Sequence, residues 1–207
     1  MTATTTAAPG LRERKKAQTR QALQDAAMDL FVRQGFDGAT VEEIADACEV
    51  SPRTFFRYFP TKEDVLFADS QERCAALVQV LAAQPGDRSP FPALHTAMRA
   101  VALEYRDERP VLLARSEIVQ ASPNLRAYKA EHQRGWEESV VGELRRRAEA
   151  RGSATSPLEL RLVASVSIAA LRAALDTWLD DPDAPDILVL LDQAFEHVAE
   201  GFAARGA

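Results

Sequence analysis

The chain has 207 residues, of which 46% are hydrophobic, and its formal net charge at pH 7 is -6. This length allows one or two domains with real cores, and the acidic balance excludes a generally basic nucleic-acid binder. Two cysteines are too few for a disulfide scaffold, and the longest uncharged helical stretch, residues 162–171, is far short of the ~20 residues that span a bilayer. We therefore expect a soluble, cytoplasmic protein with no membrane partner.

Charge is distributed unevenly along the chain. Residues 1–62 carry nine Lys and Arg against eight Asp and Glu, a net of +1, which leaves -7 for the remainder. The apolar residues are rich in Ala and Leu and form few β-branched runs, which favours helices throughout. A small neutral-to-basic module is thus predicted to precede a larger acidic body.

The first 60 residues predict a disordered tail (1–11) and a module of three helices (12–60). Apolar residues at helical spacing indicate an amphipathic first helix that stops at Gly35. Thr40 opens the second helix as a capping box with Glu43 three residues on. The second and third helices are both very short and are separated by a tight turn.

Residues 61–207 predict a second, larger helical domain. Thr61, with Asp64 at the capping-box position, begins a helix that runs to about Leu81. Proline-containing loops separate the helices that follow, which are expected at about 91–105, 110–123, 125–148, 158–180 and 184–204. The whole chain is predicted to be all-α, with about nine helices.

The stretch VSPRTFFRYFPTKEDVL, residues 50–66, combines large rings with positive charge. Two short helices divided by a tight turn are typical of a helix-turn-helix, whose second helix enters the major groove of DNA. Phe55 and Phe59 can anchor that helix from beneath. Arginine reaches guanine edges, and hydroxyl, phenol and ammonium groups suit phosphate oxygens. The residues predicted to contact DNA are Thr40, Ser51, Pro52, Arg53, Thr54, Phe56, Arg57, Tyr58 and Lys62.

Residues 20–66 resemble the N-terminal DNA-binding domain of the tetracycline-repressor (TetR) family of bacterial regulators. The resemblance implies a homodimer whose first three helices bind a palindromic operator. It also implies that the C-terminal helices hold a small-molecule pocket and a four-helix dimer interface. Two positions depart from the family pattern: Phe56 stands where Tyr is common, and Glu49 stands where the turn commonly has Gly. If residue 49 needs a positive φ, glutamate there costs on the order of 1 kcal/mol.

Residues 113–147 of the C-terminal domain resemble a TetR subgroup with acyl-CoA-like ligand-binding domains. We expect a cavity for a mostly apolar metabolite whose one anionic end meets Arg115 or a neighbour. A long-chain acyl thioester is the first candidate, and a planar aromatic compound is the second. Each apolar candidate for the wall could equally belong to the plain core. The candidates are Phe67, Met98, Tyr105, Leu112, Arg115, Trp136, Val140 and Trp178.

The last two predicted helices share one apolar stripe and also carry apolar residues outside it. A helix that is apolar on more than one side needs more than one partner. We therefore expect these two helices to form a homodimer interface, with burial inside one chain as the alternative. The residues predicted at the interface are Val166, Ala170, Ala173, Leu191, Phe195 and Val198.

The sequence offers little support for catalysis. The three histidines are dispersed, and neither a Cys/His cluster with metal-ligand spacing nor a phosphate-binding glycine loop occurs. We expect no cofactor and no metal. The predicted function is a DNA-binding regulator, in first place a repressor, that a small-molecule effector releases from its operator. A protein-interaction module with helix-turn-helix geometry and a helical enzyme are the alternatives.

Overall fold

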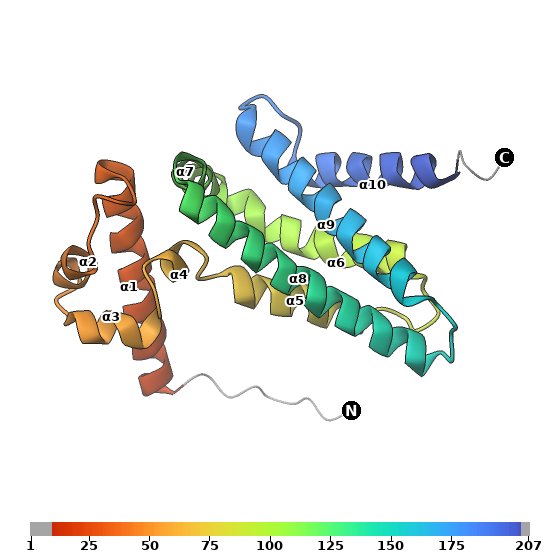
Figure 1. The fold of residues 1–207 in the computed structure, drawn as a ribbon, viewed down its shortest axis with the longest axis horizontal. Helices are drawn as coiled ribbons and strands as arrows, with labels where there is room; N and C mark the ends of the chain where they lie inside the picture. Colours follow the sequence, from red (N-terminus) through yellow and green to blue (C-terminus); the bar gives the residue numbers. More distant parts are fainter. Residues whose placement is uncertain (1–9, 204–207) are drawn as a thin grey trace.

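The computed structural model describes residues 10–203, in which every regular element is a helix and no strand occurs. The predicted all-α class is confirmed, while the predicted tail at residues 1–11 lies almost wholly outside the described residues. Helices α1, α2 and α3 form a small body at one end, and α5 to α10 form a longer bundle beside it (Figure 1). The elements are α1 Leu11–Gln34, α2 Val41–Ala47, α3 Pro52–Tyr58, α4 Glu63–Leu66, α5 Ser70–Ala82, α6 Pro90–Tyr105, the short 3-10 helix η1 Arg106–Glu108, α7 Arg109–Ala121, α8 Pro123–Ala150, α9 Pro157–Asp180 and α10 Ile187–Ala203.

Two reciprocal caps set where α2 and α4 begin. At the start of α2, Thr40 N donates to Glu43 Oε2 at 2.9 Å, and Glu43 N donates to Thr40 Oγ1 at 3.2 Å. Before α4, Thr61 N donates to Asp64 Oδ2 at 2.8 Å, and Asp64 N donates to Thr61 Oγ1 at 3.2 Å. Both predicted capping boxes are confirmed. They satisfy backbone N–H groups that the first turn of a helix leaves without partners.

One continuous helix was predicted from residue 61 to about 81. That prediction is wrong, because the structure divides the segment into two helices, α4 and α5. At the break, backbone carbonyls accept hydrogen bonds from arginines of distant helices. Arg115 Nη1 donates to Leu66 O at 3.1 Å, and Arg20 Nη2 donates to Ala68 O at 2.6 Å. These long-range bonds satisfy the backbone where the helical ladder is interrupted. Local periodicity does not reveal them, since each partner is almost 50 residues away.

Buried side chains form two separate cores. The first belongs to α1 through α4 and contains large side chains such as Phe31, Ile44 and Phe55. It also takes in Ile118 of α7 and Leu125 of α8, so the packing crosses the boundary predicted at residue 60. The second core fills the bundle of α5 to α10.

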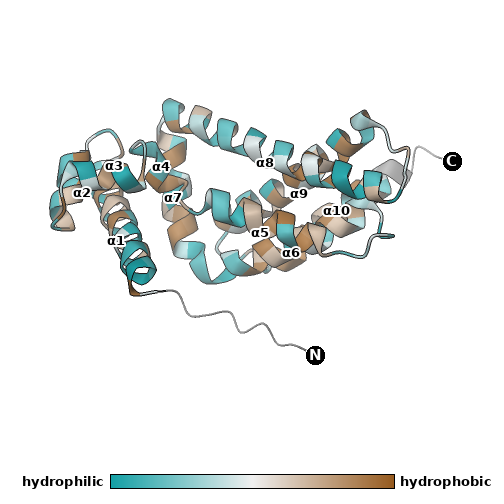
Figure 2. Ribbon diagram, turned by 90° about the horizontal axis from the view of Figure 1, so that it is seen from below, coloured by the Kyte–Doolittle hydropathy of each residue, from teal (hydrophilic) through white to brown (hydrophobic). Residues whose placement is uncertain are grey.

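The long helix α8 packs less completely than its neighbours. Hydrophobic residues concentrate on α6, α9 and α10, whereas α8 is largely hydrophilic along its length (Figure 2). Between Leu125 and Val140, α8 contains no buried residue. This middle part of α8 therefore lies at the surface of the bundle without a buried residue of its own. No helix within residues 10–203 combines enough length and hydrophobicity to cross a membrane.

Candidate DNA-binding surface and ligand cavity

Helix α3 is fixed to its module by aromatic side chains on one face. Phe55 and Phe59 are buried, at 0% and 2% exposure, and their ring centroids lie 5.6 Å apart. Arg20 of α1 lies over the Phe59 ring at 5.4 Å. Because these contacts hold α3 from one side, its other side is free to be presented rigidly. The anchoring role predicted for the two phenylalanines agrees with this burial.

The opposite face of α3 carries the residues predicted to contact DNA. Arg53, Phe56 and Arg57 are exposed, and Phe56 is 51% exposed although it is a large apolar ring. Its one close aromatic neighbour in the described residues is Phe55, which it meets edge-on at 5.5 Å. The Arg57 guanidinium lies 5.2 Å from the centre of the Tyr58 ring. An exposed ring between two exposed arginines suits a groove that offers both thymine methyls and hydrogen-bonding base edges.

The predicted hydroxyl contacts are engaged in capping. Ser51 Oγ accepts from Thr54 N at 3.2 Å, and the two hydroxyls lie 3.0 Å apart. Pro52 is the first residue of α3. Thr40 Oγ1 donates to Glu43 Oε2 at 2.9 Å. These side chains therefore stabilise the starts of α2 and α3, and a DNA contact would use their remaining lone pairs or the helix N–H groups.

Lys62 has an intramolecular role that the sequence did not indicate. Its Nζ donates to Phe36 O at 2.7 Å and to Ala39 O at 2.8 Å, and it lies 4.2 Å from the centre of the Phe36 ring. The ammonium thus ties the start of α4 to the turn between α1 and α2. Of its three donors, one is left for a phosphate.

A second basic surface adjoins α3. The first turns of α1 and the end of α3 enclose a hollow that is lined by four cationic side chains. The residues predicted to contact DNA include three. The lining residues of the hollow are Arg12, Glu13, Lys15, Lys16, Thr19, Arg57 and Tyr58. The sequence signal for it is the pair Lys15 and Lys16, which can be read either as a minor-groove contact or as a solvated helix end.

The turn between α2 and α3 contains one residue whose backbone adopts the left-handed conformation. Glu49 has φ 54°, the one positive φ at a non-glycine position within the described residues. Its backbone N donates to Asp46 O at 3.0 Å, and Val50 N donates to Ala45 O at 3.0 Å. The turn therefore has the conformation that glycine would adopt more easily, and the strain expected for glutamate is present.

The C-terminal bundle contains a cavity of about 170 Å³ beneath the middle of α8. Residues of the α4–α5 break, α5, α6, α7, α8 and α9 line it. The predicted wall residues Phe67, Tyr105, Leu112, Arg115 and Trp136 are among them. The other lining residues are Ser70, Arg73, Ser116, Val119, Lys129, His132, Gln133, Ile168, Leu171, Arg172, Leu175, Asp176 and Leu179.

Three predicted wall residues do not line this cavity. Met98 and Val140 are fully buried in the second core, and Trp178 is 7% exposed within it. The Trp178 ring is covered by the Arg109 guanidinium at 5.2 Å. An apolar periodicity shows that these residues face inward, but it does not show which inward residues border a void. The alternative of plain core holds for these three.

Aromatic side chains seal the cavity toward α4. The Phe67 ring stacks on His132 of α8 at 5.0 Å, and Tyr128 lies 4.9 Å from the same imidazole. Tyr128 OH donates to Asp64 Oδ1 at 2.5 Å, and Trp136 Nε1 donates to Ser70 Oγ at 2.9 Å. Helix α8 is therefore fastened to both sides of the α4–α5 break.

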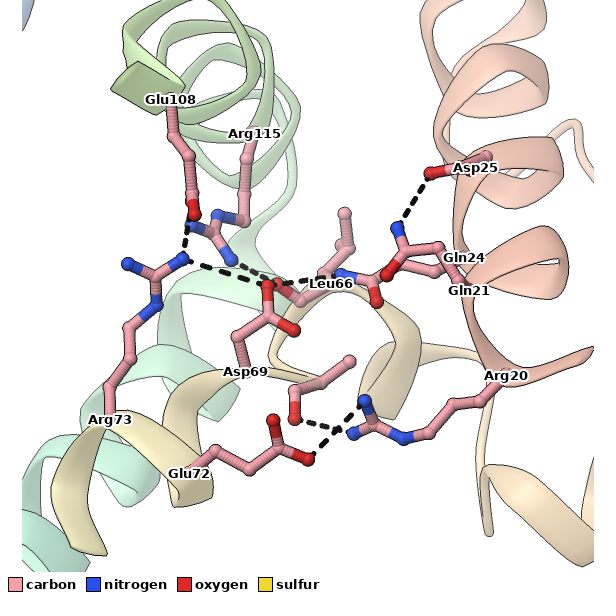
Figure 3. Close-up of polar contacts among 11 residues, drawn as sticks. Arg20, Gln21, Gln24, Asp25, Leu66, Asp69, Glu72, Arg73, Glu108 and Arg115 are labelled. Carbon is pink, nitrogen blue, oxygen red and sulfur yellow. Dashed lines mark hydrogen bonds and ion pairs between the residues drawn. The ribbon is translucent and has the colours of Figure 1, made fainter. Parts of the chain in front are cut away.

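Arginines form the polar part of the cavity wall. Arg73 of α5 is 7% exposed, pairs with Glu108, and lies 4.8 Å from the centre of the Tyr105 ring. Burial lowers the pKa of Arg73, but the hydrogen bond to Glu108 and the neighbouring negative charges outweigh it and raise the value. The pKa of Arg115 is lowered, first by burial and then by the positive charge of Arg73. Two guanidiniums thus share one small, partly dry space (Figure 3).

A chain of polar contacts leads from this wall to α1. Arg73 lies 3.8 Å from Asp69 Oδ2, and Gln24 Nε2 of α1 donates to the same oxygen at 3.2 Å (Figure 3). Arg20 of α1 also contacts α5, through Glu72 at 3.6 Å. Sequence reasoning missed Arg20, Gln24, Asp69 and Arg73, because the local apolar pattern does not show which polar side chains of distant elements meet. The signal that could have found Gln24 is its position on the buried stripe of the first helix.

The predicted dimer residues are partly used inside the chain. Three of them are buried within one chain and belong to the second core: Ala170 is 5% exposed, Leu191 is 0% exposed and Phe195 is 3% exposed. For these three the alternative of burial inside one chain describes the structure, because the shared stripe is the face with which the last two helices pack on their own bundle. The dimer interface itself stays a prediction. Ala173 is exposed, and Val166 and Val198 are half-buried. Large exposed apolar residues of these helices are Leu158 (77%), Leu162 (46%) and Val189 (45%).

Comparisons with known proteins agree with this division of the chain. Residues 23–68 match the family described as bacterial regulatory proteins, tetR family, and residues 88–203, more than half of the chain, match the MftR C-terminal domain. The chain is 38% identical to the HTH-type transcriptional regulator TcmR of Streptomyces glaucescens, over 58% of this chain and 55% of TcmR. It is 28% identical to the transcriptional regulator MftR of Mycobacterium tuberculosis, over 91% of this chain and 93% of MftR.

Solved structures extend the likeness to the whole fold. FadR of Thermus thermophilus, a TetR-family repressor in complex with lauroyl-CoA, has a TM-score of 0.56 and 26% identity over 88% of this chain and 94% of FadR. A transcriptional regulator of Pseudomonas aeruginosa has a TM-score of 0.61 and 21% identity over 91% of this chain and 92% of its own. The chain belongs to the TetR family of bacterial regulators, and it is a DNA-binding transcriptional regulator rather than an enzyme.

Proposed function

We propose that this regulator is a repressor that binds a palindromic operator as a homodimer in the cytoplasm and is released by a small molecule in the cavity under α8. The observation that carries the proposal is the polar bridge between the cavity wall and the DNA-binding body. Arg73 and Arg115 border the cavity, and their contacts reach Asp69 and the Leu66 carbonyl. Both acceptors lie at the α4–α5 break, which packs on α1.

The bridge offers a physical route for release. A ligand that draws Arg73 or Arg115 into the cavity weakens the contact of Arg73 with Asp69 or that of Arg115 with the Leu66 carbonyl. The hydrogen bond from Gln24 to Asp69 is then weakened as well. In a dimer, a small tilt of α1 in each protomer changes the spacing of the two α3 helices. That spacing has to match the period of the major groove, so operator affinity falls. The ligand has to bind the DNA-incompetent state better, and a 100-fold preference corresponds to about 2.7 kcal/mol of coupling.

The effector class belongs to the same proposal. A mostly apolar wall with cationic groups suits a hydrophobic metabolite with an anionic end. FadR of Thermus thermophilus, which this chain resembles at 26% identity, is described in complex with lauroyl-CoA. An acyl thioester and a simpler hydrophobic anion are therefore the two chemical classes to compare.

Operator selection followed by fluorescence anisotropy tests the proposal. A palindromic site should emerge from a random pool, bind at two copies of the chain per site, and lose affinity steeply as salt rises. Lauroyl-CoA or a hydrophobic acid should then lower that affinity at least tenfold. Failure to select any site would favour a protein-interaction module over a DNA-binding repressor. A selected site whose affinity no cavity ligand changes would leave DNA binding intact and contradict the proposed release.

A further inference from the structure

The cavity lining is strongly cationic in an otherwise acidic chain. Its charged side chains are Arg73, Arg115, Lys129, Arg172 and Asp176, that is four positive and one negative. Glu108 and Asp69 contact Arg73 from outside the lining, so the local net charge is one positive charge when they are included. The whole chain carries -6 at pH 7. A local excess of one sign within a concave site focuses the field and favours a ligand of the opposite sign. An anionic ligand is thus indicated before any single contact is considered.

Arg73 adds a second, independent observation. It is more than nine-tenths buried, and its Nε and Nη1 have no hydrogen-bond partner within the described residues. Its contacts with Glu108 and Asp69 both use Nη2. Buried donors of a charged group are nearly always satisfied, because the loss of water is otherwise uncompensated. Arg73 therefore keeps hydrogen-bonding capacity that the chain itself does not use.

Arg115 is the second half of the same wall. It approaches Arg73 from α7, and Figure 3 shows the two guanidiniums converging beside Leu66 and Asp69. Its hydrogen bond in the described residues is to the Leu66 carbonyl, and it forms no ion pair there. Glu108 and Asp69 offset part of the repulsion between the two guanidiniums, and a further negative group bound beside them offsets more of it.

We propose that Arg73 and Arg115 form an anion subsite that takes the carboxylate of a hydrophobic acid, which enters the cavity acid-first. This rests on the proposed function, whose effector class it narrows. The apolar part of the acid then lies against Leu112, Trp136 and Leu175, which line the rest of the cavity. Arg73 Nε and Nη1 have almost no accessible surface, so a carboxylate would have to draw this side chain toward the cavity to accept charge-assisted hydrogen bonds from them. An acyl thioester would instead bring an uncharged hydrocarbon end to these arginines and leave the same donors unsatisfied.

The experiment compares ligands that share an apolar part and differ in charge. Octanoate, octanol and octanoyl-CoA form one series, and naphthoate and naphthol form a second in case the cavity prefers a ring. Binding to the 207-residue chain is followed by tryptophan fluorescence, to which Trp136 in the cavity lining contributes, and by calorimetry. At least one carboxylate should bind about tenfold or more tightly than its uncharged counterpart, since hydrogen bonds to charged groups are the strong ones. Its affinity should also exceed that of octanoyl-CoA.

Variants locate the preference on the two arginines. Arg73→Met should reduce the preference of the carboxylate over its uncharged counterpart to less than about threefold, and Arg115→Met provides a second test if the first variant does not fold. Arg134→Met is the matched control: it removes the same charge from α8 at an exposed position outside the cavity lining and should leave the preference unchanged. Thermal unfolding of each variant checks that the fold is retained.

The outcomes separate this inference from the proposed function. Equal binding of acid and neutral ligand, or a preference that survives both arginine variants, overturns the anion subsite. Octanoyl-CoA that binds and releases operator while the acids do not also overturns it, although ligand-controlled repression then stands. Arginine-dependent binding of an acid that leaves operator affinity unchanged supports the subsite and contradicts the release mechanism.

Discussion

At the scale of single residues, Arg53 and Lys62 were both predicted to contact DNA, but the structure gives them different surroundings. Arg53 is exposed on α3, and its contact with base edges stays a prediction. Arg53→Ala should weaken operator binding by about 1–3 kcal/mol and change binding to random DNA far less. Arg33→Ala, an exposed arginine at the end of α1, is the matched control. Equal losses on operator and random DNA would reject base contact by Arg53.

Lys62 is expected to matter for stability as well as for DNA. Its ammonium donates to Phe36 O and Ala39 O, so Lys62→Ala removes two charge-assisted hydrogen bonds and leaves two carbonyls without them. Because the site is only partly buried, we expect a loss of about 1–2 kcal/mol in the free energy of unfolding. Urea unfolding measures this, and the salt dependence of DNA binding separately measures a phosphate contact. Unchanged unfolding would show that the two bonds contribute nothing.

Glycine substitutions at Glu49 and at Glu42 should change the free energy of unfolding in opposite directions. Its φ of 54° is costly for any residue with a Cβ, so Glu49→Gly should raise the free energy of unfolding by about 0.5–1 kcal/mol after the greater freedom of glycine in the unfolded chain is subtracted. Glu42→Gly lies inside α2 and should lower it by about 1 kcal/mol. Thermal unfolding compares them. Destabilisation by both changes would mean that the turn gains more from the glutamate than the strain costs.

At the scale of elements, the sequence predicted what depends on neighbours along the chain. Helix type, the boxes at Thr40 and Thr61, and the burial of Phe55 beneath α3 all follow from spacings of three or four residues. The break between α4 and α5 does not, because it depends on Arg20 and Arg115, which are distant in sequence.

The cavity wall was predicted only in part for the same reason. Five of its predicted residues line the void, but three others that obey the same apolar periodicity fill solid core. Whether an inward residue meets a neighbour or a space is decided by the packing of several helices together. Arg73 was missed because burial of a charged residue depends on tertiary partners such as Glu108 and Tyr105.

The bridge through Asp69 can be separated from ligand binding. Asp69→Ala removes the group that contacts both Arg73 and Gln24, but Asp69 itself does not line the cavity. We expect the affinity for a cavity ligand to change less than about fivefold, while the ligand's effect on operator affinity falls about tenfold. Gln71→Ala, an exposed change two residues further on at the start of α5, is the control. Full coupling in Asp69→Ala would place the route elsewhere.

At the scale of the whole molecule, a dimer should use the apolar side chains that one chain leaves exposed. Leu162→Arg should give a folded monomer, because Leu162 of α9 is 46% exposed in a single chain. Phe195→Asp should instead unfold the chain, because Phe195 is 3% exposed and an unpaired charge would be buried. Leu103→Arg, at an exposed position of α6, is the control for the added charge. Light scattering measures the oligomeric state, and circular dichroism measures folding. A dimeric Leu162→Arg variant would place the interface on another face.

If the cavity and the DNA-binding surface are coupled through one conformational equilibrium, a reciprocal titration of ligand and operator should reveal it. The affinity of the tightest hydrophobic acid or acyl-CoA is measured for the free protein and for the operator complex, and operator affinity is measured with and without that ligand. Linkage requires both ratios to be the same factor. We expect a factor of about ten or more, with ligand and operator each weakening the binding of the other. A ligand that occupies the cavity tightly and gives a factor of one in both directions would contradict it.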